Sequence, residues 1–94
     1  MKLRSFRNKL LRRFYEDGTT KGLAPGSAKK LRAMFAVLDR MKAVEELKEW
    51  PLWQVHTLTG DRKGTWSMNI TRNWRLTFRI EADEIVDIDL EDYH

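Results

Sequence analysis

The chain contains no cysteine, so it can form neither a disulfide framework nor a thiolate metal site. It has only two histidines, His56 and His94, which do not define a zinc site unless carboxylates complete one. We therefore expect no metal and no cofactor. No apolar run is long enough to span a membrane or to act as a secretory signal, and we expect a cytoplasmic protein.

Aromatic residues are plentiful, with four tryptophans and four phenylalanines among the 94 residues. A disordered chain has few such side chains, and the apolar fraction of 41% is enough for a packed core. The length fits a single domain over residues 1–94, in which folding buries about two-thirds of the unfolded surface.

Charge is distributed unevenly along the chain, although the net charge is only +4. Lysine and arginine dominate residues 1–48, and acidic residues dominate residues 81–92. A basic half of this kind can neutralise a phosphate backbone and release its counterions. A solvated helix surface has the same composition, so charge alone leaves nucleic-acid binding open.

The first half of the sequence predicts a short strand over residues 3–6 and two helices. Apolar residues recur at helical spacing within residues 7–17, and Gly18 follows as a C-cap. Ser27 is expected to be the N-cap of a second helix over residues 28–42, whose apolar stripe belongs to the core.

The second half predicts strands over residues 53–57, 65–70 and 74–80, with a closing strand from residue 85. The expected fold class is α+β, with two N-terminal helices packed on one face of a mainly antiparallel sheet of four to five strands.

Residue parity predicts the length of the central hairpin loop. A three-residue loop over residues 71–73 places Met68 opposite Leu76 and keeps the apolar side chains on one face, whereas a two-residue loop mixes the faces. Such a loop requires a left-handed residue, which Asn73 can supply. The opposite face then carries Ser67, Asn69, Arg75, Thr77 and Arg79.

That polar face could be simply solvated, as in many antiparallel sheets, or it could be a working surface. Arg75 favours the second interpretation, because a guanidinium in the middle of a strand can hold a phosphate with two parallel hydrogen bonds.

The closing strand ends in Asp92, Tyr93 and His94, three side chains that can carry or orient protons. A rigid strand would hold them in place, and His94 would then bear both an imidazole and the terminal carboxylate. The alternative is a frayed end without a role.

Four segments together resemble HigB-type toxins of the RelE/ParE superfamily of bacterial toxin-antitoxin systems, and the similarity extends nearly end to end. They are Val-His-Thr-Leu-Thr-Gly-Asp-Arg at 55–62, Gly-Thr-Trp-Ser at 64–67, Asn-Trp-Arg-Leu-Thr-Phe at 73–78 and Glu-Asp-Tyr-His at 91–94. The resemblance implies a RelE-like fold. It also implies a ribonuclease that cuts messenger RNA on the translating ribosome without a metal, by attack of the RNA 2′-hydroxyl on the adjacent phosphate.

The resemblance places functional positions on His56, Arg75, Asp92, Tyr93 and His94. One histidine would accept the 2′-hydroxyl proton and the other would help to protonate the leaving 5′-oxygen, in an order that the sequence leaves open. Arg75 would stabilise the phosphate, Asp92 would orient an imidazole, and Tyr93 would stack on a base or donate a proton. The alternative for His56 is a structural histidine that anchors its strand.

Further contacts to RNA or the ribosome are expected from basic side chains. One departure from the family concerns Thr59, because some relatives have lysine at this position; Arg62 or Lys63 could supply the missing cation. The full set expected to contact RNA or the ribosome is Arg4, Arg7, Lys9, Arg12, Arg13, Lys29, Lys30, Arg62, Lys63 and Arg79.

The partners implied by the resemblance are the ribosome, messenger RNA and a small helix-turn-helix antitoxin, through which the pair would bind operator DNA indirectly. We expect no membrane partner. Two alternative functions stay open at this point: a non-catalytic basic module that binds RNA or DNA, and a toxin relative directed at DNA gyrase.

Overall fold

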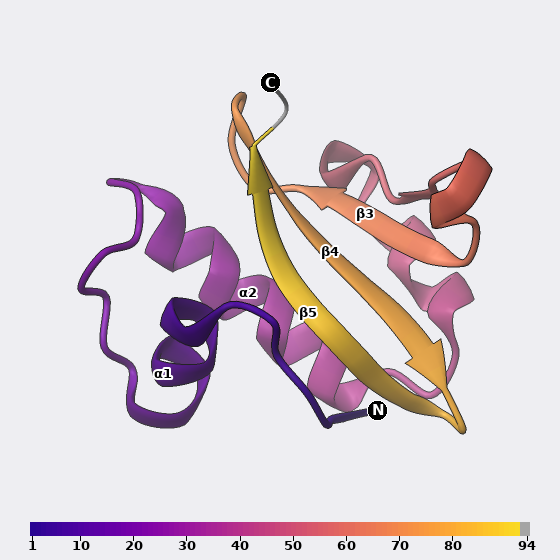
Figure 1. Cartoon of the computed structure of the whole chain (residues 1–94), viewed down its shortest axis with the longest axis horizontal. Coiled ribbons are helices and arrows are strands. Elements are labelled where there is room, and N and C mark those ends of the chain that lie inside the picture. The colour runs from indigo at the N-terminus through magenta and orange to yellow at the C-terminus, as the bar shows by residue number, and fades with distance from the viewer. Residues whose placement is uncertain (93–94) are drawn as a thin grey trace.

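The computed structural model describes residues 1–92, and its strands form one sheet in the order β1-β5-β4-β3-β2 (Figure 1). Strand β1 is parallel to β5, and the other neighbours are antiparallel. The expected α+β class is confirmed. The elements are β1 (Lys2–Leu3), α1 (Lys9–Asp17), α2 (Ser27–Arg40), the 3₁₀ turns η1 (Val44–Glu49), η2 (Pro51–Trp53) and η3 (Gly60–Arg62), and the strands β2 (His56–Thr57), β3 (Thr65–Asn69), β4 (Trp74–Glu81) and β5 (Glu84–Asp92).

Local signals set the helix ends. The Asn8 side chain caps α1 by accepting a backbone N–H three residues ahead at 3.0 Å. Gly18 ends α1 in the left-handed region at φ 76°, as predicted. Ser27 is not the N-cap of α2 but its first residue, because its hydroxyl donates to the Ala24 carbonyl at 2.6 Å instead of capping the helix.

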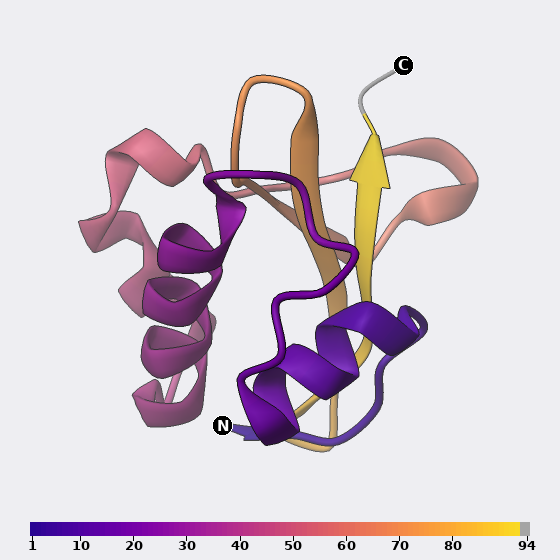
Figure 2. The ribbon, with the colours of Figure 1, turned by 90° about the vertical axis from the view of Figure 1, so that its left-hand side faces the viewer.

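The core lies between the two helices and one face of the sheet, and Figure 2 shows the helices next to each other beside the strands. The aromatic rings of Phe14 in α1 and Phe35 in α2 are 6.0 Å apart. No helix among residues 1–92 is both long and apolar enough to cross a membrane. Fully buried core residues include Leu11, Leu31, Met34 and Leu38 from the helices and Met68, Leu76, Phe78, Ile85 and Ile88 from the sheet.

The predicted hairpin register is confirmed. Met68 pairs with Leu76, and the Ile70 amide donates to the Trp74 carbonyl at 2.9 Å, so the loop spans three residues. The left-handed conformation expected at Asn73 is wrong, because Asn73 does not have a positive φ. A second hydrogen bond, from the Thr71 amide to Trp74 at 3.2 Å, helps to close this loop.

The predicted strand over residues 53–57 is mostly wrong. Pro51, which has no amide donor, begins the turn η2, and Gln54 follows in the left-handed region at φ 48°. The rings of Trp50 and Trp53 stack at 5.2 Å and stabilise this turn. Only His56–Thr57 remains as a strand. The strand expected over residues 3–6 is similarly reduced, to β1 and one bridge at Phe6.

A β-bulge in β5 was not predicted. The register of β4 against β5 shifts between Thr77 and Arg79, where one residue of β4 faces two residues of β5. Asp87 lies in the bulge with φ 55°. Ile85 and Ile88 are three residues apart, yet both are fully buried in the same core. The bulge makes this possible, because strict alternation would place them on opposite faces.

Replacing Asp87 tests the backbone requirement at the bulge. We expect Asp87→Val to lower the free energy of unfolding by about 1–2 kcal/mol, because a β-branched residue disfavours the left-handed region. Asp87→Asn is the matched control, because asparagine also removes the charge but tolerates this conformation. Urea unfolding measures both, and equal losses in the two variants would show that the charge, not the backbone, matters here.

Candidate active site

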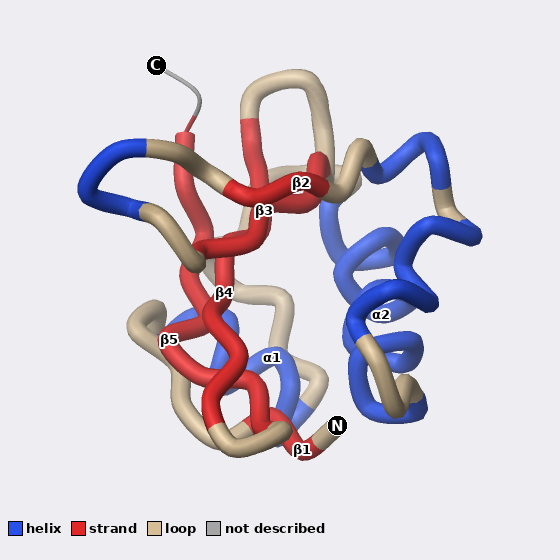
Figure 3. The backbone as a smooth tube through the Cα atoms, turned by 90° about the vertical axis from the view of Figure 1, so that its right-hand side faces the viewer, coloured by secondary structure: helices blue, strands red, loops and turns tan. Residues whose placement is uncertain are grey.

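A row of polar residues crosses four strands on the face opposite the helices. His56 pairs with Ser67, Ser67 with Thr77, and Thr77 with Asp89. Directly opposed residues project from the same face of a sheet, so this row runs from β2 to β5. Figure 3 shows the four strands in their order across the sheet, from β2 to β5.

A second row, formed by Asn69, Arg75 and Glu91, lies beside the first. The two rows are connected through Gln54: its backbone oxygen is 2.7 Å from His56 Nδ1, and its side-chain oxygen accepts a hydrogen bond from Asn69 at 2.6 Å. His56 and Arg75, two of the expected site residues, therefore lie on one face of the sheet.

The tautomer of His56 follows from its contact with Gln54. A carbonyl oxygen only accepts hydrogen bonds, so Nδ1 must carry the proton in this contact. In the neutral ring, Nε2 is then left as the atom that can accept a proton. His56 is exposed, which fits a residue that meets a ligand better than one that only anchors a strand.

The carboxylate of Glu91 is the centre of a charged cluster. Its Oε1 accepts from Arg62 Nη1 at 2.7 Å, and its Oε2 accepts from Arg62 Nη2 and from the Thr77 hydroxyl, both at 2.5 Å. Arg75 Nη2 lies 3.5 Å from Oε1. The side chains of Glu91 and Arg75 are only 19% and 18% exposed, so these charges interact in a partly desolvated setting.

The hydrogen bonds from Arg62, followed by that from Thr77, lower the pKa of Glu91 to about 2, although burial acts in the opposite direction. The same contact raises the pKa of Arg62. Glu91 is therefore ionised at neutral pH and is unsuited to accept a proton there.

The centre of the polar face is not solvated. Ser67 and Thr77 are 0% and 2% exposed, and Ser67 Oγ has no hydrogen-bond partner within residues 1–92. The loop that carries η3 extends across toward the upper end of β5 in Figure 3 and brings Arg62 to Glu91.

The remaining expected catalytic positions are at the end of the chain. Asp92 is the last described residue of β5 and pairs with Trp74. Because neighbouring residues of a strand point to opposite faces, Asp92 projects from the face opposite Arg75 and Glu91, so the structure does not bring it into the polar row. Tyr93 and His94 lie outside the described residues.

The basic residues expected to contact RNA form two groups: arginines that have protein partners or line a cavity on the polar face, and side chains that are exposed elsewhere on the molecule. Arg79 approaches the Lys63 carbonyl at 3.5 Å and Glu81 at 3.9 Å, and Arg4 contacts Glu84 at 3.1 Å. Arg7, Arg62 and Arg79 line a cavity of about 200 Å³ on the polar face together with Asp61, Thr65, Thr77, Asp87, Asp89 and Glu91. The others are exposed elsewhere, namely Lys9, Arg12 and Arg13 on α1, Lys29 and Lys30 on α2, and Lys63 after η3.

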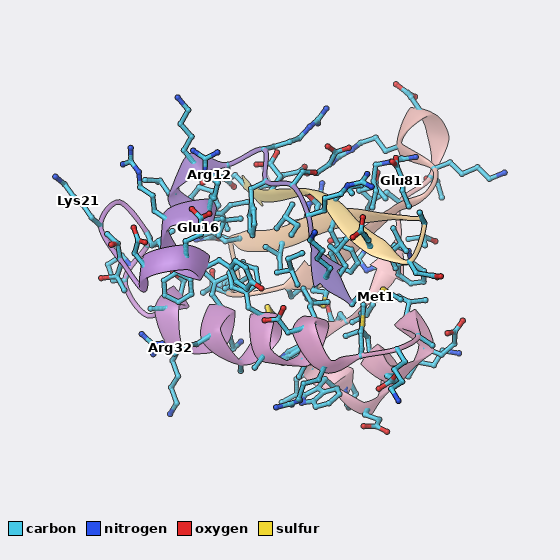
Figure 4. All side chains as sticks on the ribbon, turned by 90° about the horizontal axis from the view of Figure 1, so that it is seen from below. Met1, Arg12, Glu16, Lys21, Arg32 and Glu81 are labelled. Atoms are coloured by element: carbon cyan, nitrogen blue, oxygen red, sulfur yellow. The ribbon has the colours of Figure 1, made fainter. Side chains whose placement is uncertain are left out.

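Figure 4 shows Arg12 and Arg32 on the helices, at the end of the molecule away from Glu81 in the β4–β5 hairpin. Within the described residues, no group of three or more histidine, cysteine or carboxylate side chains is placed to hold a metal ion.

Sequence reasoning did not include Glu91 among the site residues, although it placed Thr77 on the correct face. The alternation of side chains could be continued from Arg75 through the β4–β5 turn into β5, but it pairs Arg75 with Glu91 only if the bulge in β5 is known. The contact with Arg62, 29 residues away in the sequence, had no sequence signal.

Comparison with known proteins agrees with this fold. A relative from Proteus vulgaris named endoribonuclease HigB is 30% identical over 92 residues, which cover 98% of this chain and 99% of the relative. The crystal structure of YafQ from E. coli superimposes with a TM-score of 0.59 at 12% identity, over 98% of this chain and 94% of that one. The YoeB-YefM complex from Staphylococcus aureus gives 0.57 at 18% identity, over 100% and 99%.

Two helices on one face of this five-stranded sheet define an α+β protein of the RelE-like class. Residues 4–94 match the RelE-like toxin HigB of type II toxin-antitoxin systems. The chain belongs to this HigB-like toxin family.

The lowered pKa of Glu91 predicts a loss of stability in acid. Because the folded pKa is about 2 and the ordinary value is 4.5, the stabilisation is present above pH 4.5 and is lost as the pH falls toward 2. Over this range we expect the parent to lose about 2–3 kcal/mol more unfolding free energy than Glu91→Gln. Urea unfolding at several pH values tests this expectation, which identical pH profiles would contradict.

Proposed function

We propose that this chain is a ribosome-dependent endoribonuclease toxin that cuts messenger RNA without a metal and thereby stops translation and growth. The observation that carries the proposal is the presence of His56 and Arg75 on one face of the sheet, beside the strand that leads to Asp92. The name of the Proteus vulgaris relative supports the endoribonuclease activity.

The reaction requires a base, an acid and a cation, and the site residues supply these groups. The 2′-oxygen loses its proton to a base and attacks the adjacent phosphorus, while the bond to the 5′-oxygen breaks and that oxygen takes a proton from an acid. The products are a 2′,3′-cyclic phosphate and a free 5′-hydroxyl.

The roles follow from the chemistry of each side chain. One of the two imidazoles, His56 or His94, accepts the 2′-hydroxyl proton, and the other donates a proton to the leaving 5′-oxygen; His56 does so through Nε2. Asp92 orients an imidazole. Arg75 stabilises the negative charge that develops on the phosphate. Tyr93 stacks on a base of the single-stranded message. The cations at 9, 12 and 13 on α1 and at 29 and 30 on α2 attract the ribosome at long range.

Substitution of Arg75 tests the site. We expect Arg75→Ala to lower cleavage of ribosome-bound message by roughly 100-fold or more, because the developing charge loses its cation. His56→Ala and His94→Ala should have effects of similar direction. Arg40→Ala, an arginine at the exposed C-terminal end of α2, is the matched control and should cleave like the parent.

Cleavage is measured by primer extension on translating ribosomes, together with growth after induction. Undiminished activity in Arg75→Ala and His94→Ala would contradict the proposed site. If charge reversal at Arg12, Arg13, Lys29 and Lys30 alone abolished function, the chain would be a binding module. Gyrase inhibition without message cleavage would identify a gyrase-directed toxin.

The family also indicates a protein partner, because its members belong to toxin-antitoxin systems. We propose a small helix-turn-helix antitoxin encoded beside this chain, which binds the toxin and carries it to operator DNA. Co-expression of the neighbouring reading frame should restore growth and co-purify with this chain. Growth arrest that persists despite expression of that frame would contradict this assignment.

A further inference from the structure

Glu91 stands between two arginines that come from different parts of the chain. Arg62 lies in the η3 loop between β2 and β3, and Arg75 lies in β4 directly opposite Glu91. Both guanidinium groups reach the same oxygen, Oε1, at 2.7 and 3.5 Å. The carboxylate therefore connects a loop, β4 and β5 at one point.

We propose that Glu91 is a positioning residue that holds Arg75 and the η3 loop in the arrangement needed to receive the scissile phosphate. This inference rests on the proposed ribonuclease function and adds a residue to its site. Glu91 would not itself touch the RNA; it would act through Arg75.

The geometry favours positioning, because the two arginine contacts differ. Arg62 is held by two short parallel hydrogen bonds and forms a neutral pair with the carboxylate. The contact of Arg75 is longer, so a phosphate oxygen can compete for this guanidinium. The negative charge of Glu91 also offsets the repulsion between the two cations, which would otherwise separate them.

The η3 loop needs such an attachment. Its two ends carry glycines with positive φ, Gly60 at 71° and Gly64 at 93°, which give the backbone conformational freedom. The Arg62 side chain is 43% exposed, and its bidentate pair with Glu91 ties the loop to β5. Loss of the pair would leave the loop held to the polar face by the longer contact of Arg79 with the Lys63 carbonyl, at 3.5 Å.

An opposite role for Glu91 is also testable, because a carboxylate beside two arginines could mask a phosphate site. A mask predicts that Glu91→Gln frees Arg62, increases RNA affinity and makes the salt dependence of binding steeper by about one phosphate contact. Positioning predicts instead that Glu91→Gln lowers the cleavage rate and changes RNA affinity little. The sign of the effect therefore separates the two roles.

The experiment compares Glu91→Gln, Glu91→Asp and Arg62→Ala with the parent in message cleavage on ribosomes. We expect each variant to lower kcat by roughly 10- to 100-fold, because small displacements of a phosphate ligand are costly, while KM changes by less than about threefold. The double variant Glu91→Gln with Arg62→Ala should be no worse than the more impaired single variant, because both remove one shared interaction.

Glu84→Gln is the matched control, because Glu84 also lies in β5 and pairs with an arginine, Arg4, at 3.1 Å. It should cleave like the parent. Circular dichroism verifies folding, and if Glu91→Gln does not fold, Glu91→Asp decides, since it keeps the negative charge but shortens the side chain that reaches both arginines.

Arg75→Ala in the same assay separates failure of this inference from failure of the proposed function. If Arg75→Ala loses activity while Glu91→Gln and Arg62→Ala keep it, Glu91 has no positioning role. Faster cleavage or tighter RNA binding by Glu91→Gln would identify a mask and overturn the proposal. Full activity of Arg75→Ala would instead reject the proposed active site.

Discussion

Which side chains enter the core and which lie on the polar face of this protein depends on the register of its last strand, β5. A strand alternates its side chains between two faces, and the bulge at Asp87 resets that alternation once within β5. Ile85 and Ile88 can therefore both enter the core, while Asp89 and Glu91 emerge on the opposite face. One extra residue in the ladder thus connects the packing of the core to the composition of the polar face.

This register places the carboxylate of Glu91 on the polar face, where arginines can pair with it. The helices cover the apolar face, so the polar face is free to receive the η3 loop and, with it, Arg62. The resulting cluster is only partly solvated, and a lone carboxylate there would be costly without its partners. Arg62 and Thr77 satisfy Glu91. The fold therefore contains an ionised acid and two cations within a few ångströms of each other, next to the row that contains His56.

Part of this structure could be predicted from the sequence, for clear physical reasons. The central hairpin was predictable because Met68 and Leu76 belong to strictly alternating strands, where only one loop length keeps the faces apart. The strand before it was not, because Pro51 and the stacking of Trp50 on Trp53 favour a helical turn over an extended chain. The bulge was hidden because adjacent apolar residues at 85 and 86 permit two registers. For the same reason only part of the site could be predicted from the sequence. His56 and Arg75 were expected, but the position of Glu91 depends on the bulge and on a contact with a distant loop.

The charge asymmetry of the sequence also has a different meaning in the folded chain. The acidic residues of the second half are partly neutralised, because Glu81, Glu84 and Glu91 pair with arginines, Arg4 among them. The excess positive charge is therefore concentrated on the exposed lysines and arginines of the helices. Charges there act over about a Debye length and increase the rate of encounter with an anionic partner. The arginines of the sheet are instead partly neutralised by their carboxylate partners, so they act mainly at contact distance. The exposed cations of the helices and the ion-paired arginines of the sheet thus lie on opposite sides of the sheet.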